Sequence, residues 1–151
     1  QRMPKEYGVR FADTASYPYL SVATPSTHDM STLREWWTES AEETQHFYNH
    51  TLHREGKAPS DMSGDIAKQI LKQHLESPSM LAMIAWQDWM AMDERLRFLN
   101  PYEERINIPA NRGHVWNYRM HMTIEQLQQE KAFNKTLLQM LSDSNRILSA
   151  K

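Results

Sequence analysis

The chain has 151 residues, of which 40% are apolar and 24% are charged, and its formal net charge is −2. This is the composition of a globular domain that can bury a core, and the charge gives no basic surface for nucleic acid or for an anionic membrane. The sequence contains no cysteine, which excludes disulfides and thiol chemistry, and no apolar run approaches the roughly 20 residues of a membrane span. We therefore expect a cytoplasmic protein.

The first half of the chain predicts a short strand, a polar turn and a long helix. The β-prone residues 19–24 predict the strand, and the polar residues 26–29 follow it. Apolar residues at spacings of three and four then predict an amphipathic helix over about 32–54. Thr32 and Glu35 form a capping-box pattern at its start.

The second half predicts two further helices, over about 63–76 and 123–148, separated by a less regular region. The uninterrupted apolar run 80–86 fits either a buried parallel strand or a buried helix, and the residue types leave that choice open. Residues 98–118 contain proline, asparagine and glycine and predict irregular structure. The order of elements indicates an α/β fold with more helix than strand.

Three histidines on the first long helix have a spacing that could chelate zinc. His46, His50 and His53 share helical spacing, but the apolar stripe of that helix leaves them toward solvent, and no cysteine or HExxH pattern accompanies them. We therefore predict a solvated helix face and no metal site.

The tryptophans divide into two groups. Trp36 and Trp37 lie on the apolar stripe of the first long helix, which favours core packing over stacking on sugar rings. Trp86, Trp89 and Trp116 flank polar segments and stay open to either role. Basic residues near the irregular segment alternate with acidic ones, which favours salt bridges over a nucleic-acid surface.

The pair His28 and Asp29 carries the strongest chemical signal. It follows the predicted end of a strand and precedes a helix, which is where α/β barrels place catalytic groups. The alternative is that Asp29 caps the following helix or lies in its first turn, a role worth about 1 kcal/mol. The residues alone do not decide between these interpretations.

Four blocks of sequence resemble the amylomaltase or disproportionating-enzyme family of 4-α-glucanotransferases, glycoside hydrolase family 77. The blocks occur in the family's order, and the resemblance extends over nearly the whole chain up to about residue 127. The blocks are Gln1-Arg2-Met3-Pro4, Ser26-Thr27-His28-Asp29 with Thr32-Leu33-Arg34-Glu35-Trp36-Trp37, Ile84-Ala85-Trp86-Gln87-Asp88, and Glu104-Arg105-Ile106-Asn107-Ile108-Pro109-Ala110 with Trp116-Asn117-Tyr118-Arg119.

The resemblance implies that the chain, as one domain piece over residues 1–151, is the C-terminal part of a (β/α)8 barrel. Residues 1–3 would end strand six, 19–24 would form strand seven, and 80–86 would form strand eight, which favours the strand interpretation of that run. In isolation such a piece would be mostly helical.

The resemblance also implies an activity, the transfer of α-1,4-glucan segments between maltooligosaccharides by a retaining double displacement. Asp29 would match the family's transition-state-stabilising aspartate, and His28 would contact the same sugar. The nucleophile and the acid/base would lie upstream of Gln1, so the chain alone would be inactive.

Further substrate contacts are expected from residues that lie in the other matching blocks, and neither a cofactor nor a metal is implied. These residues are Asn107, Trp116, Arg119, Gln87 and Asp88. Partners would be the glucan and the rest of the same barrel, with self-association of the piece also expected. The alternative is a stand-alone helical module that binds glycans or proteins without catalysis.

Overall fold

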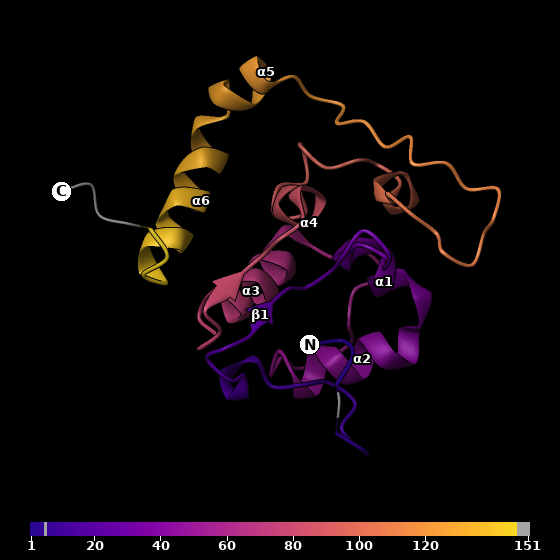
Figure 1. The fold of residues 1–151 in the computed structure, drawn as a ribbon, viewed down its shortest axis with the longest axis vertical. Coiled ribbons are helices and arrows are strands. Elements are labelled where there is room, and N and C mark those ends of the chain that lie inside the picture. The colour runs from indigo at the N-terminus through magenta and orange to yellow at the C-terminus, as the bar shows by residue number, and fades with distance from the viewer. Residues whose placement is uncertain (5, 148–151) are drawn as a thin grey trace. The chain divides into compact units, whose positions relative to one another are not determined.

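The computed structural model describes residues 1–4 and 6–147, whose regular secondary structure is mainly helical (Figure 1). Its elements are η1 Thr14–Ser16, β1 Val22–Ala23, α1 Leu33–Glu39, α2 Ala41–His50, α3 Gly64–Leu75, β2 Leu81–Ala82, α4 Trp86–Met90, η2 Pro101–Glu104, α5 Ile124–Gln129 and α6 Lys131–Asp143. The chain divides into two compact units, Gln1–Tyr118 and Arg119–Lys151. Both strands and four of the six α-helices belong to the first unit.

The two strands of the first unit pair in parallel, with Val22 opposite Leu81 and Ala23 opposite Ala82. Backbone bonds extend the pairing beyond the strands, from the Met80 amide to the Tyr19 carbonyl (2.7 Å) and from the Met83 amide to the Ala23 carbonyl (2.9 Å). The strand interpretation of the run 80–86 therefore holds for its first part. It is wrong for Trp86, which begins helix α4.

One face of the strand pair is covered and the other is open. Ala23 is completely buried, whereas Val22 and Leu81, which share the opposite face, are each 48% exposed. Successive side chains of a strand point to opposite faces, so the exposed Leu20 and Met83 extend the same open face along both strands. The pair thus presents an apolar strip to solvent.

The long helix predicted over 32–54 is two helices, α1 and α2, because the helical conformation is interrupted at Ser40. This residue is extended (φ −147°, ψ 112°), and its hydroxyl accepts a hydrogen bond from the Glu43 amide at 3.3 Å. The Ser40 hydroxyl thus acts as the N-cap of α2, because it accepts from a backbone amide that has no partner within the helix. The apolar stripe continues across the break, and Leu33, Trp37 and Phe47 are all buried.

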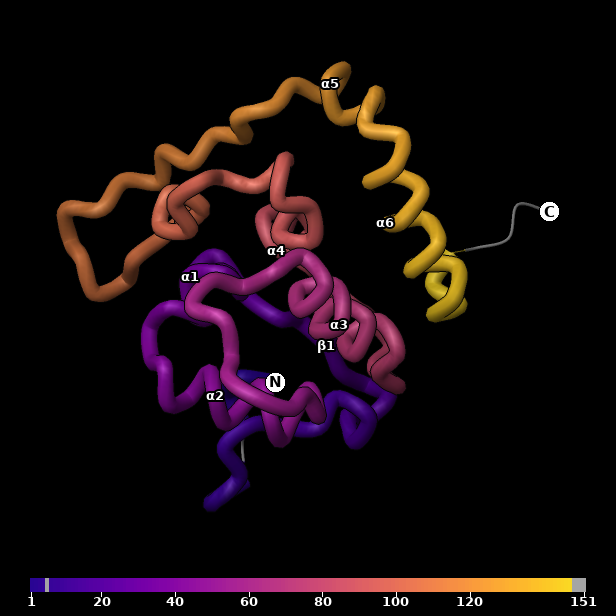
Figure 2. The backbone as a smooth tube through the Cα atoms, turned by 180° about the vertical axis from the view of Figure 1, so that it is seen from behind, coloured from indigo at the N-terminus to yellow at the C-terminus, as the bar shows by residue number. Residues whose placement is uncertain are grey.

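Helix α3 forms almost where the periodicity predicts it, within one residue of the expected 63–76 at each end. Its apolar face supplies much of the core of the first unit, through Ile66, Ala67, Ile70 and Leu71, each at most 1% exposed. The segment 98–118, predicted to be irregular, contains the short 3-10 helix η2, and residues 105–118 after it form no helix or strand; they can be traced in Figure 2.

The second unit contains α5 and α6, in place of the single helix predicted over 123–148. Thr123 and Gln126 form a capping box at the start of α5, with both reciprocal bonds present. The helix path is interrupted at Glu130, and position 148 lies outside the described residues. Across the described ranges, no helix is long and apolar enough to cross a membrane.

Candidate functional site

His28 and Asp29 lie in the segment between β1 and α1, and both side chains are open to solvent. Their exposed fractions are 53% and 54%. Helix α1 is capped by Thr32, whose hydroxyl accepts from the Glu35 amide, and the acidic residue of its first turn is Glu35. The interpretation of Asp29 as a helix cap is therefore wrong, and its carboxylate is free for another role.

Asp29 is contacted by a residue 78 positions away in the sequence. The side-chain amide of Asn107 donates a hydrogen bond to Asp29 Oδ1 at 2.6 Å, while His28 Nε2 lies 3.5 Å from Asp29 Oδ2. The exposed ring of Trp116 lies against His28, with ring centroids 5.2 Å apart. We call His28, Asp29, Asn107 and Trp116 the exposed quartet.

The quartet has the chemistry of a carbohydrate contact. A carboxylate, an imidazole and an amide offer acceptors and donors to hydroxyl groups, and an exposed indole offers a flat apolar surface next to them. Asn107 and Trp116 come from the irregular segment 105–118, so this segment positions half of the group. The sequence predicts all four residues as site residues, and the structure brings them together.

Gln87 and Asp88, also predicted as substrate contacts, lie in the interior instead, at 4% and 1% exposure. The Asp88 carboxylate accepts hydrogen bonds from the Leu33 amide (2.9 Å) and from the Ser26 hydroxyl, and the Gln87 amide donates to the Glu104 carbonyl (3.2 Å). Burial raises the pKa of Asp88, and these two donors oppose that rise. The structure does not place either residue in the quartet.

Arg119 begins the second compact unit, so its predicted role stays a prediction. Within the described ranges, no group of three histidine, cysteine, aspartate or glutamate side chains could hold a metal ion. The rings of His46 and His50 are 4.4 Å apart on α2.

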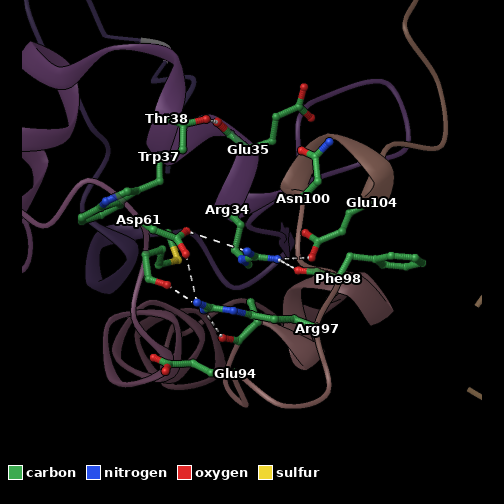
Figure 3. A network of polar contacts seen from close by, with 12 residues as sticks. Arg34, Glu35, Trp37, Thr38, Asp61, Glu94, Arg97, Phe98, Asn100 and Glu104 are labelled. Atoms are coloured by element: carbon green, nitrogen blue, oxygen red, sulfur yellow. Dashed lines mark hydrogen bonds and ion pairs between the residues drawn. The ribbon is translucent and has the colours of Figure 1, made fainter. Parts of the chain in front are cut away.

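A buried ion pair between α1 and η2 was not predicted from the sequence. Arg34 of α1 and Glu104 of η2 are 1% and 2% exposed, and Arg34 Nη1 lies 2.5 Å from Glu104 Oε1 (Figure 3). Glu104 also accepts from the Thr32 hydroxyl at 3.1 Å, and Arg34 donates to the Phe98 carbonyl at 2.7 Å. Burial raises the pKa of Glu104 to about 7, although Arg34 and Thr32 act against it. This pair ties the irregular region that follows α4 to the start of α1.

Comparisons with known proteins point to one family. The family model for 4-alpha-glucanotransferase, glycoside hydrolase family 77, matches residues 1–124. A 4-alpha-glucanotransferase from rice (Oryza sativa subsp. japonica) is 35% identical over 151 residues, which are all of this chain and 16% of the rice protein. The 4-alpha-glucanotransferase of Chlamydia pneumoniae is 33% identical over 125 residues, covering 82% of this chain and 23% of that protein.

Among solved structures, the amylomaltase from Streptococcus agalactiae in complex with acarbose matches with a TM-score of 0.62 and 21% identity. The match covers 86% of this chain and 23% of that one, and at this identity it is evidence for the fold. The chain thus spans between a sixth and a quarter of the length of these relatives. With a family model that matches most of its residues, the chain belongs to the 4-alpha-glucanotransferase family, glycoside hydrolase family 77.

Proposed function

We propose that this chain is the C-terminal part of the catalytic barrel of a 4-α-glucanotransferase, and that Asp29 is its contribution to the reaction. The observation that carries the proposal is the quartet: an exposed carboxylate in the loop after a parallel strand, bonded by Asn107 and next to His28, whose ring lies against Trp116. The relatives named above carry the same activity in their names.

The chemistry assigned to Asp29 is electrostatic. A retaining transfer of a glucosyl group passes through transition states in which the sugar ring resembles an oxocarbenium ion, and a fixed carboxylate stabilises that positive charge. Asn107 holds Asp29 Oδ1, and Oδ2, which faces His28 Nε2, accepts from a sugar hydroxyl in this proposal. His28 shares hydroxyl contacts on the same side, and the Trp116 ring supports the apolar face of a sugar.

The strand pair supports the barrel part of the proposal. Parallel strands joined through a helical crossover, with polar groups after the carboxyl end of β1, follow the pattern of (β/α)8 enzymes. The inner face of such a barrel is packed with apolar side chains, and the open strip around Val22 and Leu81 has that character. We propose that this strip faces the barrel interior and that the nucleophile and acid/base lie on strands outside the chain.

The proposal is tested in an exchange protein, defined as the rice relative in which the segment matched by this chain is replaced by residues 1–151. We expect the exchange protein to release glucose from maltotriose by transfer, and the 151-residue chain alone to release none. Turnover by the chain alone, or an exchange protein that folds but has no transferase activity, would overturn the proposal.

A glycan titration separates this function from that of a stand-alone binding module. Maltooligosaccharides are titrated into the 151-residue chain and its Asp29→Asn variant, with binding followed by calorimetry. The barrel proposal predicts weak or undetectable binding, because most sugar subsites lie outside the chain. Tight binding that does not depend on Asp29 would identify a module instead.

A further inference from the structure

The loop that carries His28 and Asp29 is fastened at both ends by the same two side chains. We call residues 25–33 the His-Asp loop. Arg2, from the first residues of the chain, contacts both Pro25 and Ser31, and Asp88, from helix α4, contacts both Ser26 and Leu33. Each side chain therefore joins the beginning of the loop to its end.

Asp88 makes its connection from a fixed position in the interior. Its Oδ2 accepts from the Ser26 hydroxyl and its Oδ1 from the Leu33 amide at 2.9 Å, so both carboxylate oxygens are used. The residue is 1% exposed and lies within α4. A carboxylate that accepts two bonds in a dry interior makes stronger and shorter bonds than a neutral group.

Arg2 makes the second connection with the fork of its guanidinium. Its Nε donates to the Pro25 carbonyl at 3.1 Å and its Nη2 donates to the Ser31 carbonyl at 2.8 Å. The guanidinium also lies 5.3 Å from the centre of the Trp36 ring, which restricts its plane. A planar fork of this kind can hold two carbonyl groups at a fixed separation.

The two side chains divide the polar groups of the loop ends by type. The groups that donate, the Ser26 hydroxyl and the Leu33 amide, meet the carboxylate of Asp88. The groups that accept, the carbonyls of Pro25 and Ser31, meet the guanidinium of Arg2. Neither residue can replace the other, and each loop end is held by one charge of each sign.

We propose that Arg2 and Asp88 are positioning residues that fix the His-Asp loop so that Asp29 stays in contact with Asn107. Neither residue belongs to the exposed quartet, and both act on it through the loop backbone. The consequence for the reaction rests on the proposed function of Asp29. The consequence for the loop itself rests only on the contacts described here.

The loop is tested directly in the 151-residue chain by NMR. Two signals report on the quartet without being bonded to Arg2 or Asp88: the Met30 amide, which donates to the Thr27 carbonyl within the loop, and the side-chain amide of Asn107, which donates to Asp29. We expect Asp88→Ala to speed exchange of the Met30 amide by about tenfold or more and to shift the Asn107 side-chain resonance, because two anchoring bonds are lost.

Two further variants separate positioning from a general loss of stability. Asp88→Asn can still accept from Leu33 and donate to Ser26, so it should restore both signals to near wild type. Leu52→Ala removes a buried apolar side chain that follows α2 and lies outside the loop. It should lower the melting temperature without changing either signal. Unchanged signals in Asp88→Ala, or equal changes in Leu52→Ala, would overturn the proposal.

The catalytic consequence is measured in the exchange protein. Asp88→Ala and Arg2→Ala should lower kcat by about tenfold or more with a smaller change in KM, because a displaced carboxylate stabilises the transition state less. Arg2→Lys should resemble Arg2→Ala, since an ammonium group cannot span two carbonyls. NMR effects in the chain without any kcat effect in an active exchange protein would refute the positioning role. An inactive exchange protein would instead refute the proposed function and leave the NMR result to decide the loop.

Discussion

At the scale of single residues, the ion pair of Arg34 and Glu104 shows that the first unit buries charged side chains. Both side chains are almost completely inaccessible, and their bonds join α1, η2 and the backbone at Phe98. Burial disfavours the charged form of Glu104, and the partners recover part of that cost. The result is a carboxyl group whose protonation is coupled to folding near neutral pH.

The pKa of Glu104 leads to a prediction about the pH dependence of stability. The pKa rises from 4.5 to about 7 on folding, so the folded chain binds one more proton than the unfolded chain between these values. The stabilising contribution is full below pH 4.5 and is lost as the pH rises through 7, by at most about 3 kcal/mol. Urea unfolding at several pH values should show this fall in the wild type and a flatter profile in Glu104→Gln. Parallel profiles for the two proteins would contradict it.

The sequence predicts the four residues of the quartet as site residues because they stand in short recognisable blocks, whereas their mutual contacts come from the structure, and their role stays a prediction. His28 and Asp29 follow a β-prone run, and Asn107 and Trp116 stand in the matching irregular segment. The interior placement of Gln87 and Asp88 was not predictable, because a polar pair after an apolar run has the same pattern whether it turns outward or begins a buried helix. The ion pair of Arg34 with Glu104 was also not predictable, since the two residues lie 70 positions apart in the sequence.

At the scale of elements, the start of α3 depends on close contact with the chain after α4. A Cβ atom built on Gly64 would lie 2.4 Å from the carbonyl oxygen of Met92, well inside van der Waals contact. The Cβ atom is bonded directly to the backbone and the Met92 oxygen is part of it, so neither atom can move away as the end of a flexible side chain would. The contact explains why glycine begins a helix that would otherwise favour alanine.

We predict that Gly64→Ala destabilises the chain, reversing the usual effect of replacing a helical glycine with alanine. The expected loss is about 1–3 kcal/mol in the free energy of unfolding, the typical cost of overpacking. Gly113→Ala is the matched control, because its Cβ would meet only the Asn111 side chain at 3.5 Å. It should change stability by less than about 0.5 kcal/mol. Denaturant melts of both variants decide the point, and equal stabilities would refute the explanation.

The length of the elements was harder to predict than their order. Periodicity identifies α3 within one residue at each end, because its apolar face is continuous and its ends carry clear signals. The apolar stripe over 32–54 hides the break at Ser40, since the stripe continues on both sides while a local cap ends the helix. Strands β1 and β2 are short because each pairs with only one neighbour among the described residues.

At the scale of the whole molecule, the strand pair leaves one face and two edges open among the described residues. Val22 and Leu81 are half exposed on its open face, and each strand has one edge that pairs with no other described strand. Exposed strand edges beside an apolar face are a template for association with other chains. The chain spans only 16% of the rice relative and 23% of the Chlamydia pneumoniae relative.

We therefore predict that the 151-residue chain self-associates through this face. Leu81→Lys places a charge at the centre of the strip and should lower the sedimentation coefficient toward that of a monomer at high concentration. Leu99→Lys is the control, because Leu99 is 98% exposed and lies before η2, away from both strands in the sequence. A monomeric wild type, or an equal effect of the two substitutions, would exclude the strand face as the contact.

The most direct test of the account is the effect of Asp29→Asn on kcat in the exchange protein, with maltotriose as donor and acceptor. We predict a loss of about 100-fold or more, because the variant keeps the shape of the side chain and removes the charge that stabilises the transition state. Asp65→Asn, which neutralises a similarly exposed aspartate on α3, should leave kcat within about twofold. An exchange protein that retains full kcat with Asp29→Asn would contradict the role assigned to Asp29.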